Sequence, residues 1–123
     1  INPKFKRLRY RYVYGIGVSE RASNHTGEIW DTLIKSDLEA KEVIAMWTEE
    51  HCYPSEPVFV AYPGRESDED DGILLSVIFD GENLKSFLVV IDAKTMKELA
   101  RADLPHVVPI SFGHGEFKEL KKE

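Results

Sequence analysis

Four short apolar segments between residues 58 and 104 constrain the fold more than any other feature of the sequence. They cover residues 58–62, 73–79, 86–92 and 98–104. Polar stretches that contain Gly, Asp and Asn separate them, which is typical of consecutive strands joined by turns. The sequence therefore predicts an antiparallel meander of four strands, which has the size of one β-propeller blade.

Further strands are predicted upstream of this meander. Residues 7–18 alternate with a period of two, which predicts a half-buried strand. Its inner face would carry Leu8, Tyr10, Tyr12, Tyr14 and Ile16. Residues 29–35 and 43–47 predict a hairpin around a charged turn. A helix over residues 37–47 is the competing interpretation, because Leu, Glu, Ala, Lys and Met favour helices. These strands would supply most of a second blade.

Two polar stretches separate the predicted strands. Residues 48–57 are predicted to form a connector, because Pro54 and Pro57 cannot donate ladder hydrogen bonds. The acidic run at residues 66–71 could bind calcium, but its spacing fails the EF-hand pattern. We expect this run to form the solvated tip of a hairpin.

Composition excludes several classes of protein. The chain has 123 residues and a net charge of −6, which argues against nucleic acid as a partner. The first dozen positions mix cations and aromatic residues, which could form a surface that binds single-stranded nucleic acid. Their period of two fits a β-strand with two different faces better. Cys52 is the only cysteine, so an internal disulfide is excluded and a reducing compartment, the cytoplasm, is expected. No apolar run approaches the roughly 20 residues of a membrane span.

Two side chains have the chemistry of a metal site. His114 follows an apolar run and lies between Gly113 and Gly115. Neutral imidazole is the commonest protein metal ligand, although a buried histidine bonded to the backbone would have the same sequence. Glu56 lies between two prolines, where it is either a functional carboxylate or an ordinary turn residue.

The order of these motifs resembles that of the carotenoid cleavage oxygenase family. The resemblance rests on the Tyr-Pro-Ser-Glu-Pro sequence at residues 53–57, the acidic loop, the strands that follow and the late cluster at residues 112–115. It implies a seven-bladed β-propeller with iron on its axis. Because family members are several times longer and this chain begins with Ile1, residues 1–123 are expected to form about the last two blades of a longer chain.

The resemblance also implies roles for both candidate residues. In this family four histidines from four blades hold Fe(II), and the last lies in a segment that usually reads Gly-Phe-His-Gly. Here residues 112–115 read Phe-Gly-His-Gly, so only His114 takes the ligand role. His25 lies in a predicted polar loop and His51 in the connector, so neither is expected to be a ligand, and His106 has no counterpart ligand in the family. The other three ligands are expected upstream of Ile1. Glu56 matches the family glutamate that accepts a hydrogen bond from an iron-bound imidazole.

The function implied by the resemblance is oxidative cleavage. An iron(II)-dependent dioxygenase of this family would cleave a conjugated double bond of a carotenoid or apocarotenoid with dioxygen and give carbonyl products. A retinoid isomerohydrolase or a combined isomerase-oxygenase is the alternative within the family. A non-catalytic β interaction module is the alternative from another class. Peripheral association with a membrane surface stays open, because the family acts on lipid-soluble substrates.

Overall fold

The computed structural model describes residues 1–19, 30–65 and 67–108. The described ranges contain strands and one turn of 3-10 helix, η1 (Pro3–Phe5), but no α-helix. The strands are β1 (Tyr12–Gly17), β2 (Thr32–Asp37), β3 (Glu42–Thr48), β4 (Cys52–Pro54), β5 (Val58–Ala61), β6 (Gly72–Asp80), β7 (Lys85–Asp92) and β8 (Glu98–Asp103). The prediction of an all-β chain is confirmed.

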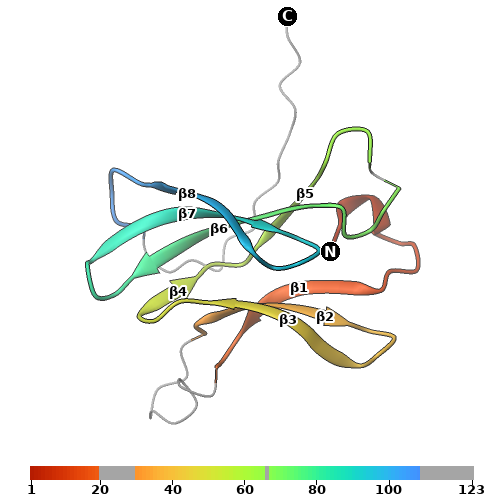
Figure 1. Cartoon of the computed structure of the whole chain (residues 1–123), viewed down its shortest axis with the longest axis horizontal. Coiled ribbons are helices and arrows are strands. Elements are labelled where there is room, and N and C mark those ends of the chain that lie inside the picture. The colour runs from red at the N-terminus through yellow and green to blue at the C-terminus, as the bar shows by residue number, and fades with distance from the viewer. Residues whose placement is uncertain (20–29, 66, 109–123) are drawn as a thin grey trace, which may run out of the picture.

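The strands form two antiparallel sheets (Figure 1). The first sheet has the order β1-β2-β3, and the hairpin of β2 and β3 replaces the competing helix over residues 37–47. The second sheet has the order β4-β6-β7-β8, with β5 also paired to β6. The predicted meander is therefore confirmed, because its four segments coincide with β5, β6, β7 and β8.

Three hairpins use the same turn chemistry. Asp37, Asp80 and Asp92 each end a strand, and each Oδ1 accepts hydrogen bonds from the backbone N–H groups two and three residues ahead. The fourth residue after each aspartate has a positive φ, at Lys41, Leu84 and Met96. A short side chain that bonds to nearby backbone N–H groups stabilises such a turn. The aspartates thus fix where β2, β6 and β7 end.

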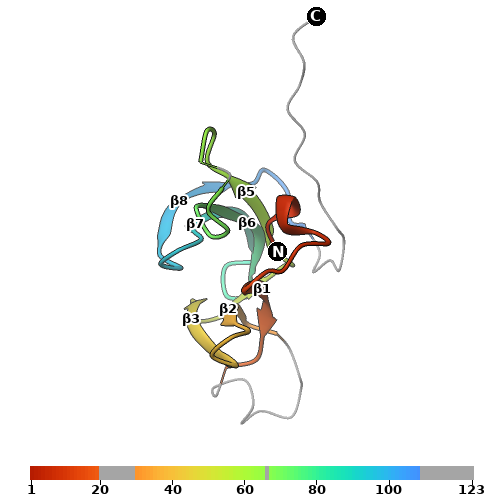
Figure 2. The ribbon, with the colours of Figure 1, turned by 90° about the vertical axis from the view of Figure 1, so that its right-hand side faces the viewer.

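The core lies between the two sheets, which pack face to face (Figure 2). Tyr14 of β1 stacks on Phe59 of β5 with ring centroids 5.8 Å apart, and its hydroxyl donates to the Ala93 carbonyl at 3.0 Å. Burial raises the pKa of the Tyr14 hydroxyl, so it stays a donor at neutral pH. The remaining buried apolar residues are Leu33, Trp47, Cys52, Leu74, Ile78, Phe87, Val89, Ile91, Ala93 and Met96.

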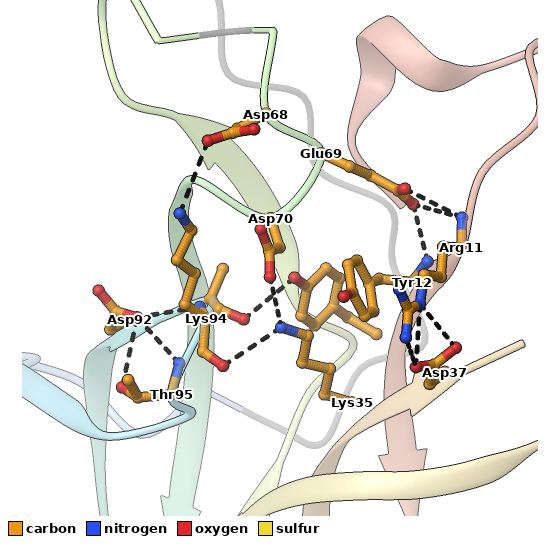
Figure 3. A network of polar contacts seen from close by, with 12 residues as sticks. Arg11, Tyr12, Lys35, Asp37, Asp68, Glu69, Asp70, Asp92, Lys94 and Thr95 are labelled. Carbon is orange, nitrogen blue, oxygen red and sulfur yellow. Dashed lines mark hydrogen bonds and ion pairs between the residues drawn. The ribbon is translucent and has the colours of Figure 1, made fainter. Parts of the chain in front are cut away.

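The acidic loop between β5 and β6 is more than the solvated tip that the sequence predicted. Asp68 is exposed, but Asp71 is only 7% exposed and Glu69 turns back toward β1. The Glu69 carboxylate accepts hydrogen bonds from the backbone N–H groups of Arg11 and Tyr12 at 2.7–3.0 Å (Figure 3). The loop therefore joins the second sheet to the start of the first.

A buried ion pair strengthens this junction. Lys35 of β2 is 2% exposed, and its Nζ lies 2.9 Å from Asp70 Oδ2 and donates to the Lys94 carbonyl at 3.2 Å (Figure 3). The ammonium also lies 4.3 Å from the centre of the Tyr12 ring, within range of a cation–π interaction. We call the contacts of Lys35 and Glu69 with the opposite sheet the inter-sheet latch. It connects the two sheets through polar groups beside their apolar core.

The strand predicted over residues 7–18 is shorter than expected. Pairing with β2 begins at Tyr12, and Leu8 and Tyr10 are 61% and 38% exposed instead of facing the core. The cause is tertiary contact, because Glu69 accepts a hydrogen bond from the backbone N–H of Arg11 and the Arg11 side chain turns to Asp37. Arg11 lowers the pKa of Asp37 to about 2, so this pair is charged at neutral pH.

Among the residues that the structure describes, no helix has the length and apolar character needed to cross a membrane.

The latch predicts a large effect of Asp70→Ala. The substitution leaves the Lys35 ammonium buried without its counter-charge, so the free energy of unfolding should fall by about 3 kcal/mol. The measurement is the midpoint of urea unfolding, with tryptophan fluorescence as the signal.

Two variants serve as controls for this prediction. Asp68→Ala in the same loop removes an exposed pair with Lys94 at 3.7 Å, and should cost less than about 1 kcal/mol. Lys35→Met combined with Asp70→Ala removes both charges and should recover most of the lost stability. Equal losses for Asp68→Ala and Asp70→Ala would contradict a latch based on a buried charge.

Candidate functional site

Glu56 lies at a break in the edge of the second sheet. Both β4 and β5 pair with β6, but the pairing shifts by one residue between them. Pro54 is opposite Ile78 and Val58 is opposite Leu75, so residues 55–57 face only two residues of β6. This arrangement is a β-bulge, a feature that redirects side chains and is frequent beside active sites. The prediction of a connector over residues 48–57 is wrong in part, because it contains β4.

The bulge turns Glu56 away from the core. Regular alternation would place Glu56 on the same face as Cys52 and Pro54, which are both buried. After the extra residue, Phe59 instead of Val58 is buried, at 6% exposure. Glu56 is exposed. The carboxylate therefore escapes the desolvation that a buried position would impose on it.

A pair of serines fixes the bulge. The Ser55 backbone N–H donates to the Val77 carbonyl at 2.9 Å, and Ser55 Oγ accepts from the Val77 N–H at 3.0 Å. Ser76 Oγ donates to the Ser55 carbonyl at 2.8 Å. We call these three hydrogen bonds the serine clasp. The sequence analysis did not predict the clasp. The one sequence feature that indicates it is Ser76, a serine within the apolar run at residues 73–79.

Both histidines within the described residues, His51 and His106, are exposed on the surface. The His51 side chain is 53% exposed and lies 3.7 Å from Glu50 Oε1. His106 is exposed in the segment after β8. His25 and His114 lie outside the described residues, so the ligand role of His114 stays a prediction.

The chain leading to His114 is held at its last described residue. Ser86 of β7 is 1% exposed, and its Oγ accepts a hydrogen bond from the Val108 N–H at 2.8 Å. The Leu104 N–H donates to the Ser86 carbonyl at 3.0 Å. The second sheet thus anchors the segment that ends six residues before His114.

The described residues do not form a metal site by themselves. In the described part of this chain, no three His, Cys, Asp or Glu side chains lie close enough to hold a metal ion. Glu56 can serve as an acceptor for an imidazole N–H, because its carboxylate is exposed and its backbone is fixed by the clasp. His114 lies outside the described residues, so its imidazole, a ligand type that suits iron, stays a predicted ligand.

The Cys52 thiol is unsuited to metal binding or nucleophilic chemistry. It is 2% exposed and donates to Glu49 Oε2 at 3.3 Å. Burial, together with Glu49, raises the pKa of this thiol to about 12, so the reactive thiolate is scarce at neutral pH.

Comparisons with known proteins agree on one family. Residues 1–119 match the family model described as retinal pigment epithelial membrane protein. The chain is 38% identical to a carotenoid dioxygenase of Neurospora crassa and covers 18% of its length. It is 39% identical to the human mitochondrial carotenoid-cleaving dioxygenase, again over 18% of that protein. These alignments include 94% and 93% of this chain, so the chain spans about a fifth of the relatives it matches.

Solved structures give the same result for the fold. A mutant of Synechocystis apocarotenoid oxygenase superposes with a TM-score of 0.78 at 29% identity, over 89% of this chain and 22% of that chain. A cobalt-substituted form of the same oxygenase gives a TM-score of 0.76 at 30% identity with the same coverage. The two meanders of this chain are therefore arranged as blades of a β-propeller enzyme.

Proposed function

The chain belongs to the carotenoid cleavage oxygenase family described as retinal pigment epithelial membrane protein, and we propose that it forms part of an iron(II)-dependent carotenoid cleavage dioxygenase. The observation that carries the proposal is the placement of Glu56 at a fixed, exposed bulge in a chain of this family. The whole enzyme would act on a carotenoid or apocarotenoid and use dioxygen as its second substrate.

Residues 1–123 are proposed to be about the last two blades of this larger propeller. Both sheets carry apolar side chains on the face away from their common core, as expected if further sheets cover them. On the first sheet Val43 and Met46 are 47% and 58% exposed beside the half-buried Ile34. On the second sheet, Ile73, Leu75, Val77, Leu88 and Val90 are half-buried.

The chain would supply two groups to the iron site. His114 would provide one of the imidazole ligands, and Glu56 would accept the distal N–H of an iron-bound imidazole. Such a hydrogen bond fixes the orientation of the ring and raises the basicity of the ligand. When bound, Fe(II) would supply the dioxygen chemistry that cleaves a conjugated double bond into two carbonyl products.

The proposed iron site is compatible with a second reaction. The alternative within the family is a retinoid isomerohydrolase or a combined isomerase-oxygenase, and the family model that matches residues 1–119 is described as retinal pigment epithelial membrane protein. A carotenoid and a retinyl ester, each given to the full-length protein, would separate the two by their products. We propose a cytoplasmic protein, as the single cysteine suggests. A lipid-soluble substrate would favour peripheral association with a membrane surface.

Replacing Glu56 tests its role beside the metal. In the full-length protein Glu56→Gln keeps the size of the side chain but weakens the acceptor, so Fe(II) affinity or turnover should fall by roughly 10–100-fold. Glu50→Gln, which changes an exposed carboxylate on the same connector, should leave both unchanged. Iron occupancy and activity are measured on both variants. Wild-type values for Glu56→Gln would reduce Glu56 to a turn residue.

Replacing the histidines one at a time tests the ligand assignment. His114→Ala in the full-length protein removes one imidazole, so iron content and oxygen-dependent cleavage should be lost while the circular dichroism spectrum stays near normal. His25→Ala, His51→Ala and His106→Ala should retain iron. Metal analysis of the four variants side by side gives the answer. Iron loss in His106→Ala with retention in His114→Ala would show that the family alignment is out of register at residues 112–113.

A further inference from the structure

Ser76 is a polar residue in an otherwise apolar row. Its neighbours on the inner face of β6, Leu74 and Ile78, are 0% exposed, as is Val89, its cross-strand partner on β7. Ser76 itself is 2% exposed. A hydroxyl in such surroundings costs free energy unless it is hydrogen-bonded, whereas an apolar side chain would simply fill the core. The role of Ser76 must therefore lie in the hydrogen bond that it makes.

That hydrogen bond controls the backbone next to Glu56. Ser76 Oγ donates to the Ser55 carbonyl at 2.8 Å. The Ser55 carbonyl and the Glu56 N–H belong to one planar peptide unit, so fixing the oxygen also fixes the direction in which the backbone enters Glu56. On the other side, Pro57 restricts Glu56 to extended conformations. The Glu56 backbone is thus constrained from both ends.

The rest of the clasp holds Ser55 on the strand. Its N–H and its Oγ both bond to Val77, at 2.9 and 3.0 Å. Here a side-chain oxygen replaces the backbone carbonyl that a regular ladder would offer to the Val77 N–H. Without the clasp, residues 55–57, which lie opposite only two residues of β6, could adopt more than one backbone conformation. With it, the bulge has one geometry.

We propose that Ser76 is a positioning residue for Glu56, setting the direction of its carboxylate toward an iron-bound imidazole. This inference rests on the proposed function of Glu56. Ser76 would not itself contact the metal or its ligands. It acts through one peptide unit, and so its effect should disappear when the Glu56 carboxylate is absent.

The test measures Fe(II) affinity in the full-length apoprotein by chelator competition, with iron alone and no substrate. Ser76→Ala should weaken Fe(II) binding about tenfold, and by no more than Glu56→Gln, since the positional effect cannot exceed loss of the carboxylate. Adding Ser76→Ala to Glu56→Gln should change the affinity less than twofold further, because both changes then act on one interaction. In Co(II)-loaded protein, Ser76→Ala and Glu56→Gln should shift the visible absorption bands alike.

Matched variants separate positioning from general destabilisation. Thr32→Val removes a hydroxyl that is also 2% exposed, bonded to Asp31 Oδ1 at 3.0 Å in the other sheet, and should keep wild-type Fe(II) affinity. Ser55→Ala removes the acceptor of the Val77 N–H and should weaken binding several-fold. Ser76→Thr keeps the hydroxyl and should bind iron like wild type. If Ser76→Ala does not fold, Ser55→Ala and Ser76→Thr test the positioning role in its place.

The outcomes distinguish the two levels of the proposal. Normal Fe(II) binding by Ser76→Ala, with weak binding by Glu56→Gln, overturns the positioning role and leaves the role of Glu56 intact. An equal loss from Ser76→Ala in the wild-type and Glu56→Gln backgrounds also overturns it. Normal binding by Glu56→Gln overturns both.

Discussion

The buried ammonium of Lys35 is the constraint on which the arrangement of the two sheets depends. A buried ion pair adds little net stability compared with apolar side chains, but it strongly penalises any arrangement that leaves one charge unpaired. Lys35 belongs to β2, and Asp70 and the Lys94 carbonyl belong to the opposite sheet. Sliding of one sheet against the other would separate this pair and leave the ammonium buried without its counter-charge. The latch therefore fixes the position of the second sheet, which carries the bulge at Glu56, relative to the first sheet.

The serine clasp applies the same principle at shorter range. Ser76 lies among residues that are 0% exposed, and its hydroxyl is satisfied by a carbonyl of the interrupted edge strand. Apolar packing would hold the sheet together without it, because Leu74 and Ile78 continue the core on both sides. What the hydrogen bond adds is a single backbone path through the bulge. A carboxylate that must meet an imidazole edge gains more from a fixed path than from extra burial.

The sequence predicted the regular part of the fold and missed the contacts between its parts. Alternation and turn residues were enough to locate β5 to β8 and to favour the β2–β3 hairpin, because both depend on local patterns. Nothing local indicated that Glu69 would bond to the backbone of Arg11 and Tyr12, 58 and 57 residues away. The same limit applies to Lys35, which resembles any charged strand residue until Asp70 is brought beside it. At the site, the motif identified Glu56, but the bulge appears only when β4 and β5 are registered against β6.

This chain is proposed to supply one imidazole, that of His114, to an iron centre whose other ligands lie elsewhere in the protein. X-ray absorption at the iron edge of the full-length protein tests it most directly, since imidazole rings give a distinct scattering pattern. Because His114→Ala is expected to lose its iron on purification, wild type and the variant would both be compared as apoprotein in excess over added Fe(II), which keeps the iron bound to protein. If His114 is a ligand, the bound iron in His114→Ala has one imidazole fewer than in wild type. An unchanged imidazole count in that variant would contradict it.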